Sequence, residues 1–131
     1  FCKIINKKIP AKIIYEDNDF LVFLDISPVS RGHALVVPRK HAADFTSLTD
    51  KEAGEFAGMV HRMAPQIVSA MSADGYNLGL NNGSAAGQIV GHVHCHIIPR
   101  YAGDDLHLWG ANSEAKELFE DTFNKLQGKI K

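Results

Sequence analysis

The most informative stretch of the chain is His92-Val93-His94-Cys95-His96-Ile97-Ile98, which Pro99 follows. The β-branched residues and the closing proline favour a strand over a helix. Side chains alternate along a strand, so we expect the three histidines on one face and the residues between them in the core. The stretch therefore predicts a central strand with a row of imidazoles on its outer face.

Four other apolar runs predict the remaining strands of a sheet. Acidic and amide side chains at residues 16–19 separate the first two runs and favour a tight turn, as in a hairpin. Pro, Ser and Gly residues bound the others. The predicted strands are Ile13–Tyr15, Phe20–Asp25, His33–Val37 and Tyr76–Leu80.

Two segments have the pattern of amphipathic helices. Thr49 and Glu52 have the spacing of a capping box, and apolar residues then recur every three or four positions at Phe56, Val60, Met63, Ile67 and Met71. Pro65 lies inside this helix and is expected to kink it or to remove one backbone hydrogen bond there. A second helix is expected to begin at Asn112 or Ser113 and to carry an apolar stripe, namely Leu118, Phe119, Thr122, Phe123 and Leu126.

The order of these elements predicts the α+β class: a five-stranded, mostly antiparallel sheet with two main helices on one face. The chain has 131 residues and no internal repeat or linker, so residues 1–131 are expected to form a single domain.

Composition excludes several classes of function. Lys and Arg number 14 and Asp and Glu 15, giving a formal net charge of -1, which argues against binding to nucleic acid or to a membrane surface. The apolar runs are too short to span a bilayer. Two cysteines, Cys2 and Cys95, do not make a disulfide scaffold, so a reducing, cytoplasmic compartment is expected.

The row of histidines is open to three interpretations. A pair such as His92 and His94 has the spacing to bind zinc, but His96 would lie about 13 Å from His92, too far for one ion to bind all three. Three histidines on a solvated face would have no chemical role. The third interpretation is covalent catalysis, in which one imidazole attacks a phosphorus or acyl centre and its neighbours orient it or move protons.

Residues 81–91, just before the histidines, are rich in glycine and neutral hydrogen-bond donors. Glycines allow successive backbone N–H groups to turn inward and bind phosphate oxygens without a lysine. Such loops are more often simple turns, but this one ends next to the candidate nucleophile. The chain has neither a phosphate-loop lysine motif nor a dinucleotide-binding glycine motif.

The histidine stretch resembles the signature of the histidine triad (HIT) family of nucleotide hydrolases and transferases. Other segments with the same resemblance are Cys2-Lys3-Ile4-Ile5, Ile9-Pro10-Ala11, Leu24-Asp25-Ile26-Ser27-Pro28, Gly32-His33, Pro38-Arg39-Lys40-His41 and Gly87-Gln88. The resemblance implies a HIT-like fold, a homodimer, and the transfer of a nucleoside 5'-monophosphoryl group from a purine nucleotide, with adenosine expected. The expected substrates are phosphoramidates, acyl adenylates or dinucleoside polyphosphates.

The resemblance also implies a role for individual residues. His94 matches the nucleophile, and His92, His96 and His33 match the histidines that flank it. Asp25 matches a carboxylate that accepts the ribose hydroxyls, and Ile26 belongs to the apolar base pocket. Asn81, Gly87 and Gln88 match groups near the α-phosphate, while Ile89 stands where a hydroxyl residue is usual.

Some family members hold a structural zinc ion, for which Cys2, His41 and His92 would be partners here. Three ligands are too few for a closed tetrahedral site, and the further cysteine would lie before Phe1, so we assign no metal and no cofactor from the sequence.

A homodimer is also favoured by the open sheet edge and by an apolar excess on the first helix, at Phe56, Met59, Val60 and Met63. The rival class is a nucleotide-binding interaction module with little catalysis.

Overall fold

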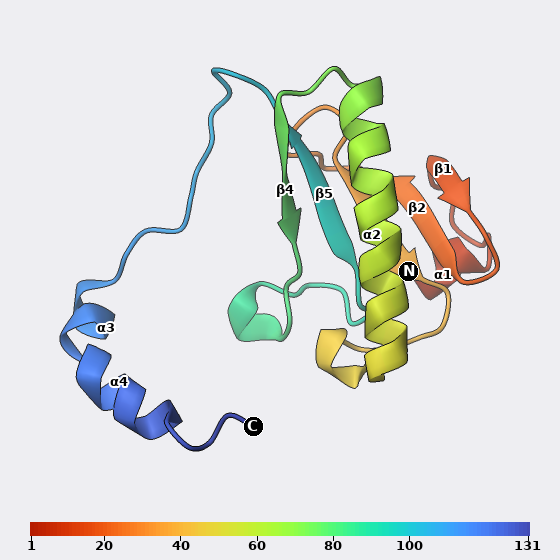
Figure 1. The fold of residues 1–131 in the computed structure, drawn as a ribbon. Helices are drawn as coiled ribbons and strands as arrows, with labels where there is room; N and C mark the ends of the chain where they lie inside the picture. Colours follow the sequence, from red (N-terminus) through yellow and green to blue (C-terminus); the bar gives the residue numbers. More distant parts are fainter.

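Five strands form one antiparallel sheet in the computed structural model, which describes residues 1–131 (Figure 1). Their order across the sheet is β1-β2-β3-β5-β4. The strands are β1 (Ile13–Glu16), β2 (Phe20–Leu24), β3 (Ala34–Pro38), β4 (Gly75–Gly79) and β5 (Cys95–Arg100). The predicted α+β class and the antiparallel sheet are confirmed.

The predicted hairpin of β1 and β2 is also confirmed, and Asp17 closes its turn. The Asp17 carboxylate accepts backbone N–H bonds from Asp19 and Phe20. These bonds satisfy donors that the turn would otherwise leave unpaired, as expected for an Asx turn.

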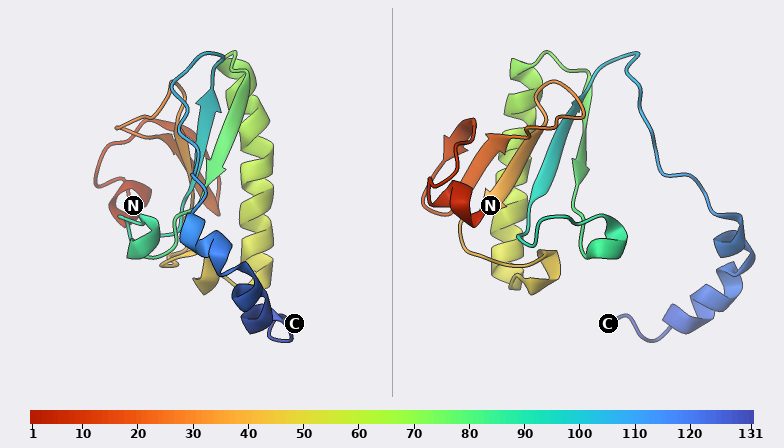
Figure 2. Two further views of the ribbon diagram at one scale, coloured as in Figure 1. Left: turned by 90° about the vertical axis from the view of Figure 1, so that its left-hand side faces the viewer. Right: turned by 180° about the vertical axis from the view of Figure 1, so that it is seen from behind.

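Strands β2 and β3 are buried on both faces. Phe20 and Val22 belong to the larger core under helix α2, whereas Leu21 and Phe23 form a smaller cluster on the opposite face. The first residues of the chain, including the short helix α1 (Cys2–Ile5), cover this second cluster. In the left view of Figure 2, α2 and α1 accordingly lie on opposite sides of the sheet.

Helix α2 (Asp50–Ala70) begins at the predicted capping box. The Thr49 side chain accepts from the N–H of Glu52, and the Glu52 carboxylate accepts from the N–H of Thr49. The helix continues through Pro65 to Ala70. Its buried side is the predicted stripe up to Ile67 with Met59 and Ala64 added, and it packs against Val93, Cys95 and Ile97. Met71, the last residue of the predicted stripe, follows the helix and is partly buried.

The extent of β5 differs from the prediction, because the strand begins at Cys95 and not at His92. The N–H of Val93 bonds to the carbonyl of Ala42, outside the sheet ladder. His92 and His94 therefore lie in the segment that leads into the strand, and the prediction of three histidines on one strand is wrong. The burial of Val93, Cys95 and Ile97 on the α2 side is as predicted.

The predicted C-terminal helix is two short helices, α3 (Ser113–Glu117) and α4 (Phe119–Leu126). Asn112 caps the first, through a bond from the N–H of Ala115. The expectation that this segment covers the sheet is wrong, because every residue from 105 to 131 is exposed and the arm stands away from the sheet (Figures 1 and 2). Two single-turn helices, η1 (Phe45–Ser47) and η2 (Ser84–Ala86), complete the fold, and none of its helices is long and apolar enough to cross a membrane.

Gly32 offers a test of how tightly the loop before β3 packs on α2. Its φ of +88° lies in the left-handed region, and an added Cβ would lie 2.7 Å from Cγ of Met71. We expect Gly32→Ala to lower the free energy of unfolding by on the order of 2 to 4 kcal/mol, through backbone strain and overpacking. Urea denaturation measures this change.

Gly54→Ala, at an exposed position of α2 where an added Cβ meets no atom within 4 Å, is the matched control. It should raise the free energy of unfolding by about 0.5 to 1 kcal/mol. Equal unfolding midpoints for the two variants would contradict the packing described for Gly32.

Candidate functional site

A cavity of about 560 Å³ lies on the sheet face opposite α2. The cross-strand pair of Leu35 and His96 places the His96 side chain on this face, because paired residues of neighbouring strands point to the same side. Apolar side chains line most of the cavity, and two histidines and one carboxylate converge on it. The lining residues are Phe1, Ile4, Ile9, Pro10, Ala11, Phe23, Leu24, Asp25, Ile26, Ser27, Leu35, Asn81, Gly87, Ile89, Val90, His94 and His96.

His94 is held in one tautomer by a backbone carbonyl. Its Nδ1 lies 2.8 Å from the carbonyl oxygen of His92. Since a carbonyl only accepts, His94 Nδ1 carries the hydrogen and Nε2 retains a free lone pair. His94 is buried, and the His96 ring lies edge-on to it at 5.0 Å. The arrangement supplies a neutral imidazole with one nucleophilic nitrogen at the cavity wall.

His33 and His96 form a second defined pair. The N–H of Val29 donates to His33 Nδ1 at 3.0 Å, so a neutral His33 carries its hydrogen on Nε2. This Nε2–H donates to His96 Nδ1 at 2.9 Å, and His96 in turn carries its hydrogen on Nε2. His33 lies behind the cavity wall and acts on it only through His96.

Burial keeps both histidines neutral. Desolvation lowers the pKa of His33, and Asp25 opposes the change. Burial also lowers the pKa of His96 to about 4, and His94 and His33 add to this effect, while Asp25 again opposes it. The Asp25 carboxylate lies 3.7 Å from His33 Nε2, and its other oxygen accepts from the N–H of Ser27.

The loop of residues 81–91 contributes backbone and apolar groups to the cavity. Asn81, Gly87 and Ile89 line it, but Gln88 does not. The Gln88 amide accepts from the N–H of Gly83 and donates to the carbonyls of Ala43 and Val90, so it braces the loop. The structure thus places Gln88 behind the loop rather than in the cavity.

Sequence reasoning missed the contribution of the N-terminal segment to this cavity. The Phe1 ring lies edge-on to His94 at 4.8 Å and to Phe23 at 5.6 Å. Ile4 and Phe23 also line the cavity, whereas Ile26 and Ile89, each 95% exposed, lie at its surface. The paired apolar residues of Cys2-Lys3-Ile4-Ile5 were the available signal, but nothing local indicates which face they cover.

Cys2, His41 and His92 lie close together, and the His92 ring is 6.0 Å from the Phe1 ring. Cys2 Sγ lies 3.7 Å from Nδ1 of each histidine, and the two Nδ1 atoms are 3.3 Å apart. Tetrahedral zinc requires separations of about 3.3 Å between two nitrogens and about 3.6 Å between sulfur and nitrogen. His92 Nε2 donates to the carbonyl of Pro38, leaving Nδ1 free as a ligand. These donors fit zinc, and a fourth ligand would complete the tetrahedron.

Asp25, His33 and His96 also bring three donor atoms within 4.8 Å of one another. Here the hydrogen bonds oppose a metal. Because Val29 already donates to His33 Nδ1, a metal on Nε2 would require His33 to lose its only ring hydrogen. This cluster is therefore a hydrogen-bond network and not a second metal site.

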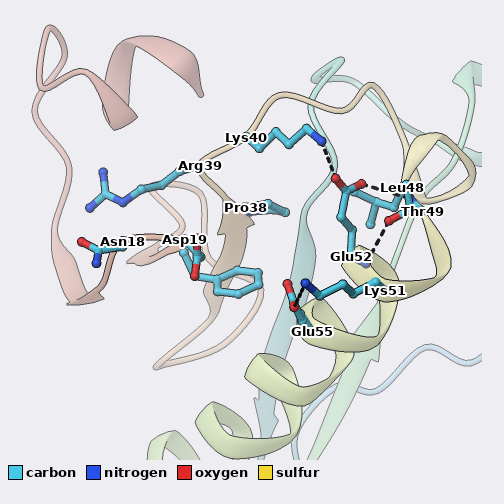
Figure 3. Close-up of a pocket in the computed structure, with 11 residues that line it drawn as sticks. Asn18, Asp19, Pro38, Arg39, Lys40, Leu48, Thr49, Lys51, Glu52 and Glu55 are labelled. Carbon is cyan, nitrogen blue, oxygen red and sulfur yellow. Dashed lines mark hydrogen bonds and ion pairs between the residues drawn. The ribbon is translucent and has the colours of Figure 1, made fainter.

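A second cavity of about 370 Å³ lies at the start of α2, and ion pairs occupy its rim (Figure 3). Figure 3 shows Lys40 pointing toward Glu52, and Lys51 lies 3.8 Å from Glu55. Arg39, also at this cavity, pairs with Glu16 at 2.8 Å. No histidine lines it and each cation has a carboxylate partner, so we assign it no chemistry.

Comparisons with curated proteins identify several relatives, and the chain spans between about half and four fifths of the length of the three described next. An uncharacterized HIT-like protein of Methanocaldococcus jannaschii is 52% identical over 104 residues, covering 79% of this chain and 80% of the relative. An adenosine 5'-monophosphoramidase of Schizosaccharomyces pombe is 42% identical, covering 76% of this chain and 72% of the relative. An adenylylsulfatase of Arabidopsis thaliana is 39% identical, covering 86% of this chain and 56% of the relative.

Solved structures agree with these relatives. A HIT family protein of Bacillus subtilis superposes with a TM-score of 0.85 at 36% identity, covering 100% of this chain and 96% of that one. A zinc-bound histidine triad family protein of Mycobacterium smegmatis superposes with a TM-score of 0.78 at 36% identity, covering 98% and 95%. The HIT domain family model matches residues 6–103. By its family model, its relatives and its fold, this chain belongs to the HIT family.

Proposed function

We propose that the chain is a nucleotide hydrolase or transferase that acts at the α-phosphate of a nucleoside 5'-monophosphoryl substrate through a nucleotidyl-histidine intermediate on His94. The observation that carries this proposal is the hydrogen bond from His94 Nδ1 to the carbonyl of His92, which leaves Nε2 as a free nucleophile. Its position in a largely apolar cavity with a carboxylate and a glycine-rich loop supports the same reading.

The reaction follows in two balanced steps. The Nε2 lone pair of His94 attacks the α-phosphorus and forms a P–N bond, while the bond to the leaving group breaks and the leaving group takes a proton. Water then attacks the same phosphorus and the P–N bond breaks, the proton that water loses replaces the one taken up by the leaving group, and nucleoside monophosphate and neutral His94 are released. The Nε2–H of His96 and backbone N–H groups of the loop supply hydrogen bonds to the phosphoryl oxygens.

Asp25 is proposed to accept the ribose hydroxyls, with Ile26 at the base and Asn81 and Gly87 near the phosphate. All four line the cavity, which supports this assignment. The relatives named for adenosine 5'-monophosphoramidase and adenylylsulfatase activity favour an adenosine substrate. Gln88 is proposed to act indirectly, by holding the loop.

Cys2, His41 and His92 would hold a zinc ion, as the zinc-bound relative supports. Such an ion supplies a structural cross-link between α1, the segment after β3 and the histidine segment. The carbonyl of His92 thus fixes the tautomer of the nucleophile, and the ring of His92 is one of the zinc ligands. A reducing, cytoplasmic compartment is proposed as well, because neither cysteine forms a disulfide.

A homodimer is the proposed assembly. Strand β4 is a sheet edge with Tyr76 and Leu78 about half exposed, and the C-terminal arm stands beyond that edge (Figure 1). Helices as short as α3 and α4 are marginal alone in water, and apolar side chains of the arm have no cover within the chain. These are Leu106, Leu108, Trp109, Leu118, Phe119, Phe123, Leu126 and Ile130.

The rival function is a nucleotide-binding interaction module with little catalysis. It would use the same cavity but would not need a free imidazole nitrogen. The single tautomer of His94 favours the enzyme.

The nucleophile is tested by His94→Asn. We expect this variant to lose at least about 10³-fold in turnover of an adenosine phosphoramidate and to form no nucleotidyl adduct, because the attacking nitrogen is gone. Mass spectrometry of quenched reactions measures the adduct, and calorimetry should show that AMP still binds. His61→Asn, on the exposed side of α2, is the control. An adduct on another residue, or substantial turnover by His94→Asn, would remove His94 from this role.

Removal of the metal with a chelator tests whether the proposed zinc ion is structural or catalytic. We expect a chelator to lower the melting temperature, because the link between α1 and the histidine segment is lost, yet to leave most adduct formation at temperatures where the fold is intact. Added zinc should restore the melting temperature. Loss and recovery of adduct formation in parallel with zinc under those conditions would make the metal catalytic.

The arm is tested by light scattering at micromolar concentration. The wild-type chain should have twice the 14.4 kDa chain mass, and Phe119→Lys should shift the equilibrium toward monomer because it places a charge in the apolar contact. Asn124→Lys, a change to the same residue elsewhere on α4, should leave the dimer intact. A stable wild-type monomer would contradict the assembly.

A further inference from the structure

One short segment of the chain belongs both to the cavity and to the candidate zinc site. Phe1 and Ile4 line the cavity. Cys2 lies between them in the chain, and its Sγ is 3.7 Å from Nδ1 of both His41 and His92. None of these three zinc donors lines the cavity. The two sites therefore share no side chain, but the backbone of neighbouring residues joins them.

Phe1 and Ile4 form one apolar wall of the cavity. The Phe1 ring lies edge-on to the His94 ring, with centroids 4.8 Å apart and an angle of 90° between the planes. Both residues pack on the smaller core cluster, of which Phe23 and Leu35 also line the cavity. If residues 1–5 moved away, the cavity would lose this wall and His94 would lose its contact with Phe1.

Few other contacts hold this segment in place. Helix α1 has four residues, none of which is buried, and no side chain caps its N-terminus. A helix of this length is unstable alone in water. The backbone hydrogen bonds of residues 1–9 stay within the segment, and the ion pair of Lys7 with Glu16 is exposed at 3.9 Å. Apart from apolar packing, the contacts of the Cys2 sulfur are thus its main connection to the rest of the chain.

We propose that the site formed by Cys2, His41 and His92 controls the affinity of the cavity for nucleotide. Zinc bound to these donors keeps residues 1–5 docked, and the docked residues complete the wall against which the nucleotide binds. This inference rests on the proposed function and adds to it a coupling between two ligands. Such coupling is reciprocal, so a nucleotide in the cavity strengthens zinc binding by the same factor.

The size of the coupling depends on how often residues 1–5 are docked without metal. A nucleotide that binds only the docked form has an apparent Kd equal to the intrinsic Kd divided by the docked fraction. If about a tenth of the metal-free molecules are docked, zinc strengthens nucleotide binding about tenfold. The coupling acts on affinity, so the rate of adduct formation on His94 at saturating nucleotide should be nearly the same with and without zinc.

Calorimetric titration with AMP tests the coupling, because AMP binding requires no turnover. The zinc-loaded chain, freed of excess metal, is compared with the chelator-treated chain at a temperature where both are folded. We expect zinc to lower the Kd for AMP about 10- to 100-fold. Competition with a zinc-binding dye, with and without saturating AMP, should give the same factor for the affinity for zinc.

Two variants separate the zinc donors from the cavity wall. His41→Ala removes a donor that does not line the cavity, so AMP should bind this variant as weakly as it binds the metal-free chain, with or without micromolar zinc. Phe1→Ala keeps all three donors but removes the aromatic wall, so zinc should still bind while its effect on AMP affinity falls below about threefold. Lys3→Ala, at an exposed position of α1, is the matched control and should keep the wild-type coupling.

Hydrogen exchange of backbone amides reports on the segment itself. Exchange in residues 2–9 should become faster when zinc is removed and slower again when AMP is added, whereas exchange in α2 should not change. Equal affinities of the zinc-loaded and zinc-free folded chains for AMP would overturn the inference and leave zinc as a structural cross-link. Full coupling in Phe1→Ala would also overturn it, because the effect would not pass through the wall. If AMP binds neither form of the wild-type chain, the proposed function itself fails.

Discussion

The alternation of side chains along the central strands is the constraint on which the rest of this molecule depends. In β2 and β3 both sets of alternating residues are buried, one set under α2 and the other under the N-terminal segment. In β5, Cys95 and Ile97 point into the α2 core, and His96 must therefore point to the opposite face. Packing of apolar side chains on the α2 face of the sheet thus places the His96 side chain on the opposite face.

Backbone hydrogen bonds convert this placement into defined chemistry. The carbonyl of His92, the N–H of Val29 and the carbonyl of Pro38 each fix the hydrogen of one imidazole. Each of four buried or half-buried histidines thereby has a defined tautomer, although no strong base lies nearby. His94 presents a free Nε2, His96 presents an N–H, and His92 presents Nδ1 to Cys2 and His41. Burial favours the neutral forms on which this pattern depends.

The N-terminal segment links the parts of the proposed site. Phe1 and Ile4 wall the cavity, while Cys2 between them faces His41 and His92. A metal held there would fix the cavity wall formed by Phe1 and Ile4 relative to the histidine segment. The C-terminal arm, in contrast, does not pack on the rest of the chain. Its apolar side chains are exposed and require a partner surface.

Much of the fold could be predicted from the sequence because it is encoded locally. The period-two pattern of Val93, Cys95 and Ile97 determined which face of β5 is core, and the reciprocal pair of Thr49 and Glu52 determined where α2 begins. The spacing of the histidines indicated covalent catalysis at a phosphorus or acyl centre as one of three interpretations, and the resemblance of several segments to the HIT family pointed to nucleotidyl transfer and to the residues to consider.

Only the tertiary structure decided where these groups act. The strand starts at Cys95 because Val93 bonds to Ala42, and Gln88 faces the backbone of Ala43, both partners about 45 to 50 positions away. The short C-terminal helices carry an apolar stripe as α2 does, yet they do not pack on the sheet. An apolar stripe indicates that one face of a helix should be buried, but it does not indicate which surface buries it. The tautomer of His96 depends on its contact with His33 across 63 positions, which no local pattern can encode. The sequence alone determined the fold class and the set of reactive groups, and tertiary contacts decided the protonation and orientation of each one.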